Sequence, residues 1–311
     1  MVSQLALGKR QMIFTKMHGI GNDYIYVNGF DRPVENPPAI ARAVSDRHFG
    51  IGGDGLVLVL PSSQADVRMQ MFNADGSEGM MCGNAIRCVA KFAHEQGLAR
   101  ANPVKIETAS GVKTIEKFFD DGDGQNVSAA TVDMGRPILT PAEIPVKLPG
   151  KLDGPIADVP LEKYIPMNSP AAWMEDCGLD MRMTCVSMGN PHVIIFCENV
   201  DAVPLEQIGP YLETQPIFPD RINVHFAQVP GPTEIKMRTW ERGSGVTLAC
   251  GTGASAVCVA AAMTGRAERS VTIHLPGGDL DIQWRQEDDN VLMTGPAAEV
   301  FSGEWMGKIR E

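Results

Sequence analysis

One stretch decides the fold of this chain: residues 239–266, TWERGSGVTLACGTGASAVCVAAAMTGR. It begins near the charged pair Glu241-Arg242, passes through a Gly/Ser turn, and places Cys250 before an almost wholly apolar run. A run with Ala and Val on every side, followed by Gly265, predicts a helix that is buried all round. Cys250 then lies where that helix begins, and there the unpaired backbone N–H groups and the macrodipole favour a thiolate over a thiol.

A second stretch, residues 73–97, has the same organisation in NADGSEGMMCGNAIRCVAKFAHEQG. Cys82 precedes a run in which apolar residues recur with helical spacing, and Gly97 lies beyond its end. Cys82 is therefore predicted to begin a helix, as Cys250 begins the other.

A fixed offset relates the two cysteine stretches. Asn22 precedes Cys82 by 60 residues (82 − 22), Asn190 precedes Cys250 by 60 (250 − 190), and the offset between the cysteines is 168 (250 − 82). The same offset aligns residues 24–28 with 192–196, Asn73 with Glu241, and Gly97 with Gly265. Gly- and Ala-rich helices match by chance often, but several landmarks in register favour two similar domains related by a pseudo-twofold. Cys82 and Cys250 could then face each other across the cleft between the domains.

The length of 311 residues suits two ordinary domains. We expect an extension at 1–11, a first domain at 12–133 plus 297–311, and a second domain at 134–296. The second domain would include a proline-rich insert at about 137–170, the natural place for a connector.

Composition narrows the class of protein. A net charge of −11 argues against a nucleic-acid partner, and no apolar run approaches membrane-spanning length. The first residues lack the features of a secretory signal. Seven cysteines without a C-x-x-C motif indicate reduced thiols, which predicts a cytoplasmic protein.

Two opposed helix-start thiols have three sensible uses: a disulfide, a metal site or paired acid/base chemistry. A reducing compartment disfavours the disulfide, and no further ligands appear with zinc spacing, so we expect no metal. Two-base chemistry fits best, because a thiolate can take a proton from one face of a carbon while a thiol gives one to the other. The N–H groups at Gly83-Asn84 and Gly251-Thr252 could bind an α-carboxylate and its growing charge.

Five motifs resemble those of diaminopimelate epimerases: MHGIGNDYIYVN, NADGSEGMMCGNAIRC, MGNPHV, INVHF and ERGSGVTLACGTGASA. The resemblance runs from about Met12 to the C-terminus. It implies an α/β (α+β) fold with two pseudo-symmetric domains, each a curled, mostly antiparallel sheet around a central helix. It also implies an isomerase without cofactor that interconverts LL- and meso-diaminopimelate for lysine and peptidoglycan synthesis, and it suggests a homodimer.

The resemblance also implies roles for individual residues. Cys82 and Cys250 would be the two acid/base residues, with Gly83-Asn84 and Gly251-Thr252 on the α-carboxylate and Asn22 at the reacting end. The residues expected to hold the substrate's second amino-acid group are Asn73, Asn190, Asn223, Glu241 and Arg242. His192 and Glu241 match residues that tune the thiols. One departure is Gly55, where some family members carry a glutamine that helps to hold the substrate.

Other interpretations stay open beside this one. The chain could be another cofactor-independent racemase, for proline, hydroxyproline or histidine, although proline racemases typically carry His where this chain has Asn84. A thiol-based binding or redox module is a weaker alternative. We expect the remaining cysteines (88, 177, 185, 197 and 258) to be core residues. No partner pattern singles out the other histidines (18, 48, 94, 225 and 274).

Overall fold

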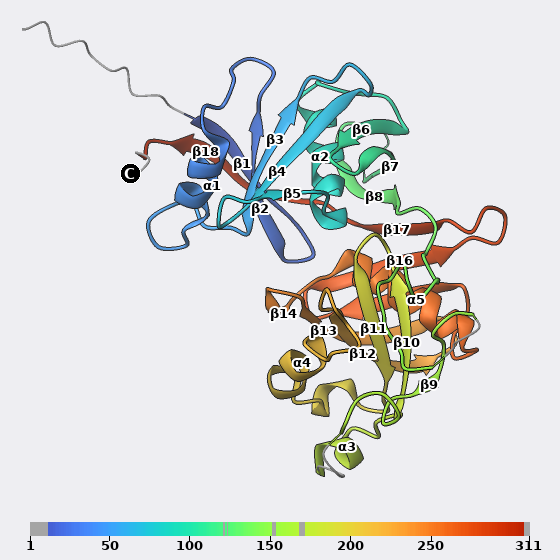
Figure 1. Ribbon diagram of the computed structural model, residues 1–311. Coiled ribbons are helices and arrows are strands. Elements are labelled where there is room, and N and C mark those ends of the chain that lie inside the picture. Colours follow the sequence, from blue (N-terminus) through green and yellow to red (C-terminus); the bar gives the residue numbers. More distant parts are fainter. Residues whose placement is uncertain (1–11, 121, 123, 151–153, 168–171, 308–311) are drawn as a thin grey trace, which may run out of the picture. The chain divides into compact units, whose positions relative to one another are not determined.

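The computed structural model describes residues 12–120, 122, 124–150, 154–167 and 172–307 (Figure 1). The expected extension at 1–11 and parts of the proline-rich insert at 137–170 lie outside the described residues. The chain divides into two compact units: unit 1 holds the described residues up to Ala130 and from Ala297 on, and unit 2 holds Thr131–Pro296. Within the described ranges, none of the helices is long and apolar enough to cross a membrane.

Unit 1 is a mixed sheet with two helices. Its elements are β1 (Met12–Gly19), β2 (Asn22–Asn28), α1 (Pro37–Ser45), β3 (Gly55–Leu60), β4 (Val67–Asn73), β5 (Glu78–Gly79), α2 (Gly83–Glu95), β6 (Val104–Thr108), β7 (Gly111–Phe119), β8 (Val127–Asp133, which reaches into unit 2) and β18 (Ala298–Trp305). The pairs β2–β3 and β4–β6 are parallel, whereas β1–β18, β1–β2, β3–β4, β4–β5 and β6–β7 are antiparallel.

Helices cover both faces of this sheet. Helix α2 contacts β1, β2, β3, β4, β6 and β7, so the sheet curls around it. Helix α1 packs on the other face, where Ile40 and Val44 join the core formed with Leu56 and Leu58. Strand β3 is therefore buried on both faces, which explains why its sequence GLVLVL is apolar throughout instead of alternating.

Unit 2 repeats this arrangement. Its elements are β9 (Val159–Pro160), α3 (Ala172–Asp176), β10 (Arg182–Ser187), β11 (Pro191–Phe196), η1 (Val200–Ala202), α4 (Leu205–Glu213), β12 (Asn223–Gly231), β13 (Glu234–Glu241), β14 (Gly245–Thr247), α5 (Gly251–Met263), β15 (Ser270–Leu275), β16 (Gly278–Trp284) and β17 (Val291–Pro296). The pairs β11–β12 and β13–β15 are parallel, and β10–β11, β12–β13, β13–β14, β15–β16 and β16–β17 are antiparallel. Helix α5 contacts β10, β11, β12, β15, β16 and β17.

The offset of 168 residues holds in the elements themselves. It separates the first residues of α1 and α4 (205 − 37), of β3 and β12 (223 − 55), and of α2 and α5 (251 − 83). Both central helices also end in the same way, with Gly97 at φ 70° and Gly265 at φ 69°. A left-handed residue just beyond a helix suits glycine, which has no Cβ. The prediction of two similar α+β units, each a sheet around a central helix, is confirmed.

The first helix begins earlier than the sequence pattern predicts. The pattern of residues 33–47 predicts a loop from Pro33 to Pro38 and a short helix from Ala39 to Arg47, but α1 runs from Pro37 to Ser45. Proline is compatible with the first turn because its missing N–H would be unpaired there anyway. The Asn36 Oδ1 accepts a hydrogen bond from the Ala39 backbone N–H at 3.4 Å and so caps the helix.

Candidate active site

Cys82 is the N-cap residue of α2, with an extended backbone at φ −130° and ψ 120°. Its carbonyl accepts the first helical hydrogen bond, from Ile86 N at 2.9 Å. Its side chain does not cap the helix and instead donates from Sγ to Asn22 Oδ1 at 3.2 Å. The thiol thus lies beside the positive end of a buried helix and against an asparagine from the start of β2.

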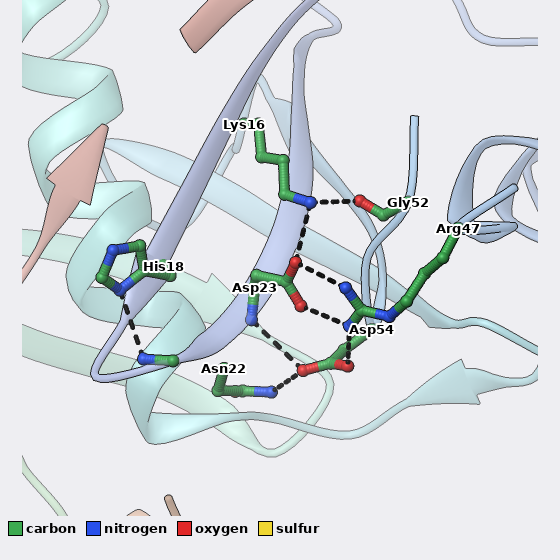
Figure 2. A network of polar contacts seen from close by, with 8 residues as sticks. Lys16, His18, Asn22, Asp23, Arg47, Gly52 and Asp54 are labelled. Carbon is green, nitrogen blue, oxygen red and sulfur yellow. Dashed lines mark hydrogen bonds and ion pairs between the residues drawn. The ribbon is translucent and has the colours of Figure 1, made fainter. Parts of the chain in front are cut away.

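Asn22 is held by a network of charged side chains that Figure 2 shows. Its Nδ2 donates to Asp54 Oδ2 at 2.7 Å, and Asp54 also receives Arg47 Nη2 at 3.1 Å. Asp23 also belongs to the network: its Oδ1 lies 2.8 Å from Arg47 Nη2, and its Oδ2 lies 2.8 Å from Lys16 Nζ. Burial alone would raise the pKa of Asp23, but hydrogen bonds and charges from Arg47 and Lys16 outweigh it and lower that pKa.

This network determines which end of the Asn22 amide meets the thiol. An ionised carboxylate only accepts hydrogen bonds, so the Asn22 NH₂ group must face Asp54. The carbonyl oxygen Oδ1 is then left to face Cys82, where it can accept the S–H proton. The hydrogen-bonding chemistry of Asp54 therefore fixes the orientation of the Asn22 amide.

The first turn of α2 is braced from within. Asn84 is 2% exposed, and its Oδ1 accepts from Arg87 Nη1 at 3.1 Å. The same nitrogen donates to the Gly83 carbonyl at 3.2 Å. Burial lowers the pKa of Arg87, whose side chain is fully enclosed in unit 1. A buried guanidinium thus fixes the two residues that follow Cys82.

Asn73 lies at the end of β4, opposite Gly55 in the ladder with β3. Its Nδ2 donates to Ser77 Oγ at 2.9 Å, which holds it in the turn before β5. Gly55 leaves no room for a side chain, because a Cβ there would come within 2.1 Å of the Phe72 carbonyl oxygen. The glutamine expected from some relatives therefore has no counterpart at this position.

Cys250 is the N-cap residue of α5 and is 4% exposed. Its backbone is extended like that of Cys82, at φ −126° and ψ 99°. Its sulfur lies 3.6 Å from the hydroxyl of Thr252, in the first turn of the helix. Next to it, Gly253 allows close packing: a Cβ there would lie 3.0 Å from the Cys250 sulfur and 2.3 Å from His225 Cε1.

A chain of hydrogen bonds leads from Thr252 into the core of unit 2. Asn190 Nδ2 donates to Thr252 Oγ1 at 3.3 Å, and Asn190 Oδ1 lies 2.9 Å from His192 Nε2. His192 Nδ1 lies 2.8 Å from His225 Nε2, and His225 Nδ1 lies 3.0 Å from Thr239 Oγ1. Both histidines are fully buried. Burial, His225 and Arg242 hold the pKa of His192 well below its usual range, and burial lowers the pKa of His225 to about 3.

The remaining predicted residues gather at the end of β13. Asn223 is buried; its Nδ2 donates to the Pro191 carbonyl at 2.8 Å, and its Oδ1 accepts from the Arg242 backbone N–H at 2.9 Å. Glu241 Oε1 accepts from Thr247 Oγ1 at 2.6 Å. The exposed Arg242 donates through Nη1 to the Asp220 carbonyl at 2.7 Å. These contacts fix the Glu241 carboxylate and the Arg242 guanidinium separately at the end of the strand.

Comparison with known proteins identifies the family of this chain. The family model for diaminopimelate epimerase matches residues 14–140 and 184–300. The chain belongs to the diaminopimelate epimerase family. The gap between the two matched segments, 141–183, contains much of the proline-rich insert.

Named diaminopimelate epimerases match this chain over nearly its whole length. One from Acetivibrio thermocellus is 52% identical over 293 residues, covering 94% of this chain and 98% of the relative. One from Desulfovibrio desulfuricans is 50% identical over 292 residues, covering 94% and 97%. Among solved structures, a Bacillus anthracis protein of the phenazine biosynthesis PhzF family shares the fold, with a TM-score of 0.66, 17% identity, and coverage of 95% of this chain and 99% of that chain.

The structure brings several predicted residues together within each unit. In unit 1, Asn22 contacts Cys82, and Gly83 and Asn84 follow in the helix. In unit 2, Asn190 contacts both Thr252 and His192. The predicted core cysteines (88, 177, 185, 197 and 258) are all buried, as expected.

Three residues that sequence reasoning left aside lie directly behind the predicted ones. Asp54 orients Asn22, Arg87 braces Asn84, and His225 contacts His192. No partner pattern singled out His225, but the structure gives it two partners. Its signal in the sequence was its place two residues after Asn223 in a buried strand, where an imidazole must find a hydrogen bond.

Proposed function

We propose that this chain is a cofactor-independent isomerase that interconverts LL-2,6-diaminopimelate and meso-diaminopimelate. Its membership of the diaminopimelate epimerase family supports the substrate. The observation that carries the reaction type is that a thiol begins the central helix of each unit. Asn22 contacts the Cys82 thiol itself, and the equivalent Asn190 contacts Thr252, two residues after Cys250.

In the proposed reaction both thiols act on one α-carbon. The thiolate of one cysteine takes the α-proton as the C–H bond breaks, and the electron pair passes into the carboxylate. The thiol of the other cysteine then gives its proton to the opposite face, which inverts the centre. The backbone N–H groups of Gly83, Asn84, Gly251 and Thr252 would stabilise the growing negative charge.

The contacts of Asn22 and Asn190 support different roles for the two thiols, one as the acid and the other as the base. Asn22 presents a carbonyl oxygen to Cys82, which suits a protonated thiol. Asn190 presents its NH₂ group to Thr252, whose hydroxyl can then donate to Cys250 and so suits a thiolate. Cys250 would therefore take the first proton and Cys82 would give one, and the roles exchange in the reverse direction.

The distal amino-acid group would be held by residues of both repeats. Arg242 offers a planar fork for a carboxylate and Glu241 a partner for an ammonium. Asn73, Asn190 and Asn223 would fix the orientation, and His192 and Glu241 would tune the thiols. Because Gly55 leaves no space for a side chain, no side-chain contact with the substrate comes from that position.

The proposal extends to the protein's setting. Both catalytic thiols must stay reduced, so we include a cytoplasmic location in the proposal. We propose that the site binds a small molecule and that the protein forms a homodimer. We also propose that residues 12–133 with 297–311 and residues 134–296 are the two epimerase domains.

The test follows the α-proton of LL-diaminopimelate in heavy water. We expect deuterium to enter at the α-carbon as the centre inverts, and neither proline, hydroxyproline nor histidine to exchange. Cys82→Ser and Cys250→Ser should each lower kcat by about 10²–10⁴-fold, the usual contribution of one acid or base. Cys258→Ser is the matched control, since it lies in the same helix α5 and its hydroxyl can keep the bond to the Arg269 carbonyl. Exchange with proline or histidine alone, or a protein that binds without exchange, would refute the assignment.

A further inference from the structure

The hydrogen-bond chain behind Cys250 ends in two residues, His225 and Thr239, that the proposed function does not use. Thr239 is 2% exposed and His225 is fully buried, so neither can reach a substrate. His225 nevertheless contacts His192, which contacts Asn190 in turn. The chain therefore links a buried hydroxyl to the first turn of α5.

The polarity of this chain follows from the chemistry of its members. Asn190 Oδ1 only accepts, so His192 Nε2 must carry the proton at that 2.9 Å contact. A neutral His192 then has a lone pair on Nδ1, which requires an N–H on His225 Nε2 at 2.8 Å. The lone pair left on His225 Nδ1 accepts from the Thr239 hydroxyl at 3.0 Å. Each donor in the chain thus points toward Thr252 and Cys250.

The reverse polarity is less favourable. It would require the Asn190 amide to turn over and both histidines to carry their protons on Nδ1. Thr239 would then accept from His225, and within the described part of the chain its hydroxyl has no other hydrogen-bond partner to receive its own proton. A buried hydroxyl proton without an acceptor costs free energy. The polarity toward Cys250 leaves no such proton.

Packing fixes His225 at this place. A Cβ on Gly253 would lie 2.3 Å from His225 Cε1, so the imidazole packs on the first turn of α5 because that residue is a glycine. Burial lowers the pKa of both histidines, which keeps them neutral and able to serve as both donor and acceptor.

We propose that His225 and Thr239 are positioning residues for Cys250. They fix the Nε2–H tautomer of His192, and through Asn190 this tautomer aims the Thr252 hydroxyl proton at the sulfur. The inference rests on the proposed function only where it takes Cys250 as the base. The ordering of the chain itself is a property of unit 2.

The first experiment reads the histidine tautomers in the unmutated protein, and variants serve only to assign the signals. The hydrogen-bond chain from Thr239 to Thr252 is called the relay below. Two-dimensional ¹⁵N–¹H spectra of the histidine-labelled protein report the tautomer of each ring, with His192→Gln and His225→Gln used to assign the signals. We expect both rings to be neutral Nε2–H tautomers at neutral pH. An Nδ1–H tautomer or an imidazolium at either position overturns the proposal, whether or not any variant folds.

The second experiment measures the alkylation of Cys250 by iodoacetamide against pH, quantified on its peptide by mass spectrometry. His225→Leu and Thr239→Val remove donors from the chain. Each should raise the pH midpoint of Cys250 alkylation by about one unit and lower kcat about tenfold, the effect of about one lost hydrogen bond, with KM unchanged. His225→Gln can place an amide N–H where Nε2–H was and should restore most of both values. His94→Leu, which removes a buried histidine from unit 1, is the matched control and should leave the Cys250 midpoint unchanged.

The outcomes separate this proposal from the proposed function. An unchanged Cys250 midpoint in a folded His225→Leu protein overturns the relay, even if diaminopimelate is epimerised. Tautomers and midpoints as expected, without α-proton exchange in the unmutated protein, support the relay and refute the reaction.

Discussion

Asp54 offers a sharp test of how Cys82 is held, because it contacts Asn22 and not the thiol. The bond from Asn22 Nδ2 to Asp54 Oδ2 is 2.7 Å long and assisted by the carboxylate charge. Asp54→Ala removes this acceptor and frees the Asn22 amide to turn its NH₂ group toward the sulfur. We expect Cys82 to lose its preference for the protonated state, so that less of the thiol is present to give its proton.

The size of the effect follows from the exposure of the carboxylate. A hydrogen bond to a charged group contributes about 1.5–3 kcal/mol when well enclosed. The Asp54 side chain is 40% exposed, so solvent screening reduces this to about 1–2 kcal/mol. If all of it is expressed in the transition state, kcat falls by about 5- to 30-fold. Asp54→Asn keeps a neutral acceptor and should show a smaller loss.

The assay combines steady-state epimerisation with pH-dependent alkylation of Cys82, read from its peptide. The pH midpoint for Cys82 should fall in Asp54→Ala, because an N–H facing the sulfur favours the thiolate. Asp66→Ala is the control, since Asp66 also lies in unit 1 but accepts from the Lys105 backbone N–H at 2.8 Å. Unchanged kcat and an unchanged Cys82 midpoint in a folded Asp54→Ala protein would refute the argument that Asp54 orients Asn22.

Three further predictions concern stability and packing. His192 and His225 are neutral when folded but protonate near pH 6.5 when unfolded, so the unfolded chain binds more protons as the pH falls from 6.5 toward 3. The free energy of unfolding should therefore fall by about 1.4 kcal/mol per pH unit for each histidine. Urea titrations at pH 7 and pH 5 measure this, and the pH dependence should be weaker in His225→Gln; an equal dependence in both proteins contradicts it. Gly253→Ala should displace His225 and cost about 1–3 kcal/mol of stability together with activity, whereas Gly231→Ala, where a Cβ meets nothing within 4 Å, should cost far less. Gly55→Gln should lower the melting temperature because its Cβ would collide with the Phe72 carbonyl, and an unchanged melting temperature would show that β3 and β4 can separate there.

Much of the fold followed from local pattern. The apolar run after Cys250 predicted a helix buried all round, and residues 253–261 of α5 are all buried. The fixed offset of Asn22 from Cys82 and of Asn190 from Cys250 predicted a repeated unit, and the repeated strand pairings confirm it. The start of α1 differs from the sequence prediction because a double proline is typical of a loop, although proline also suits the first turn of a helix.

Local sequence is enough to place each thiol at a helix start, because a cysteine before a glycine and a helical period are properties of neighbouring residues. The groups that surround each thiol depend instead on contacts between distant parts of the chain. Asp54 contacts Asn22 from 32 positions along the chain, because it lies just before β3, which pairs in parallel with β2. His225 contacts His192 from 33 positions away, because their strands β12 and β11 also pair in parallel. Amide orientation and histidine tautomer depend on these distant partners, since a hydrogen bond has a direction that residue type alone does not set.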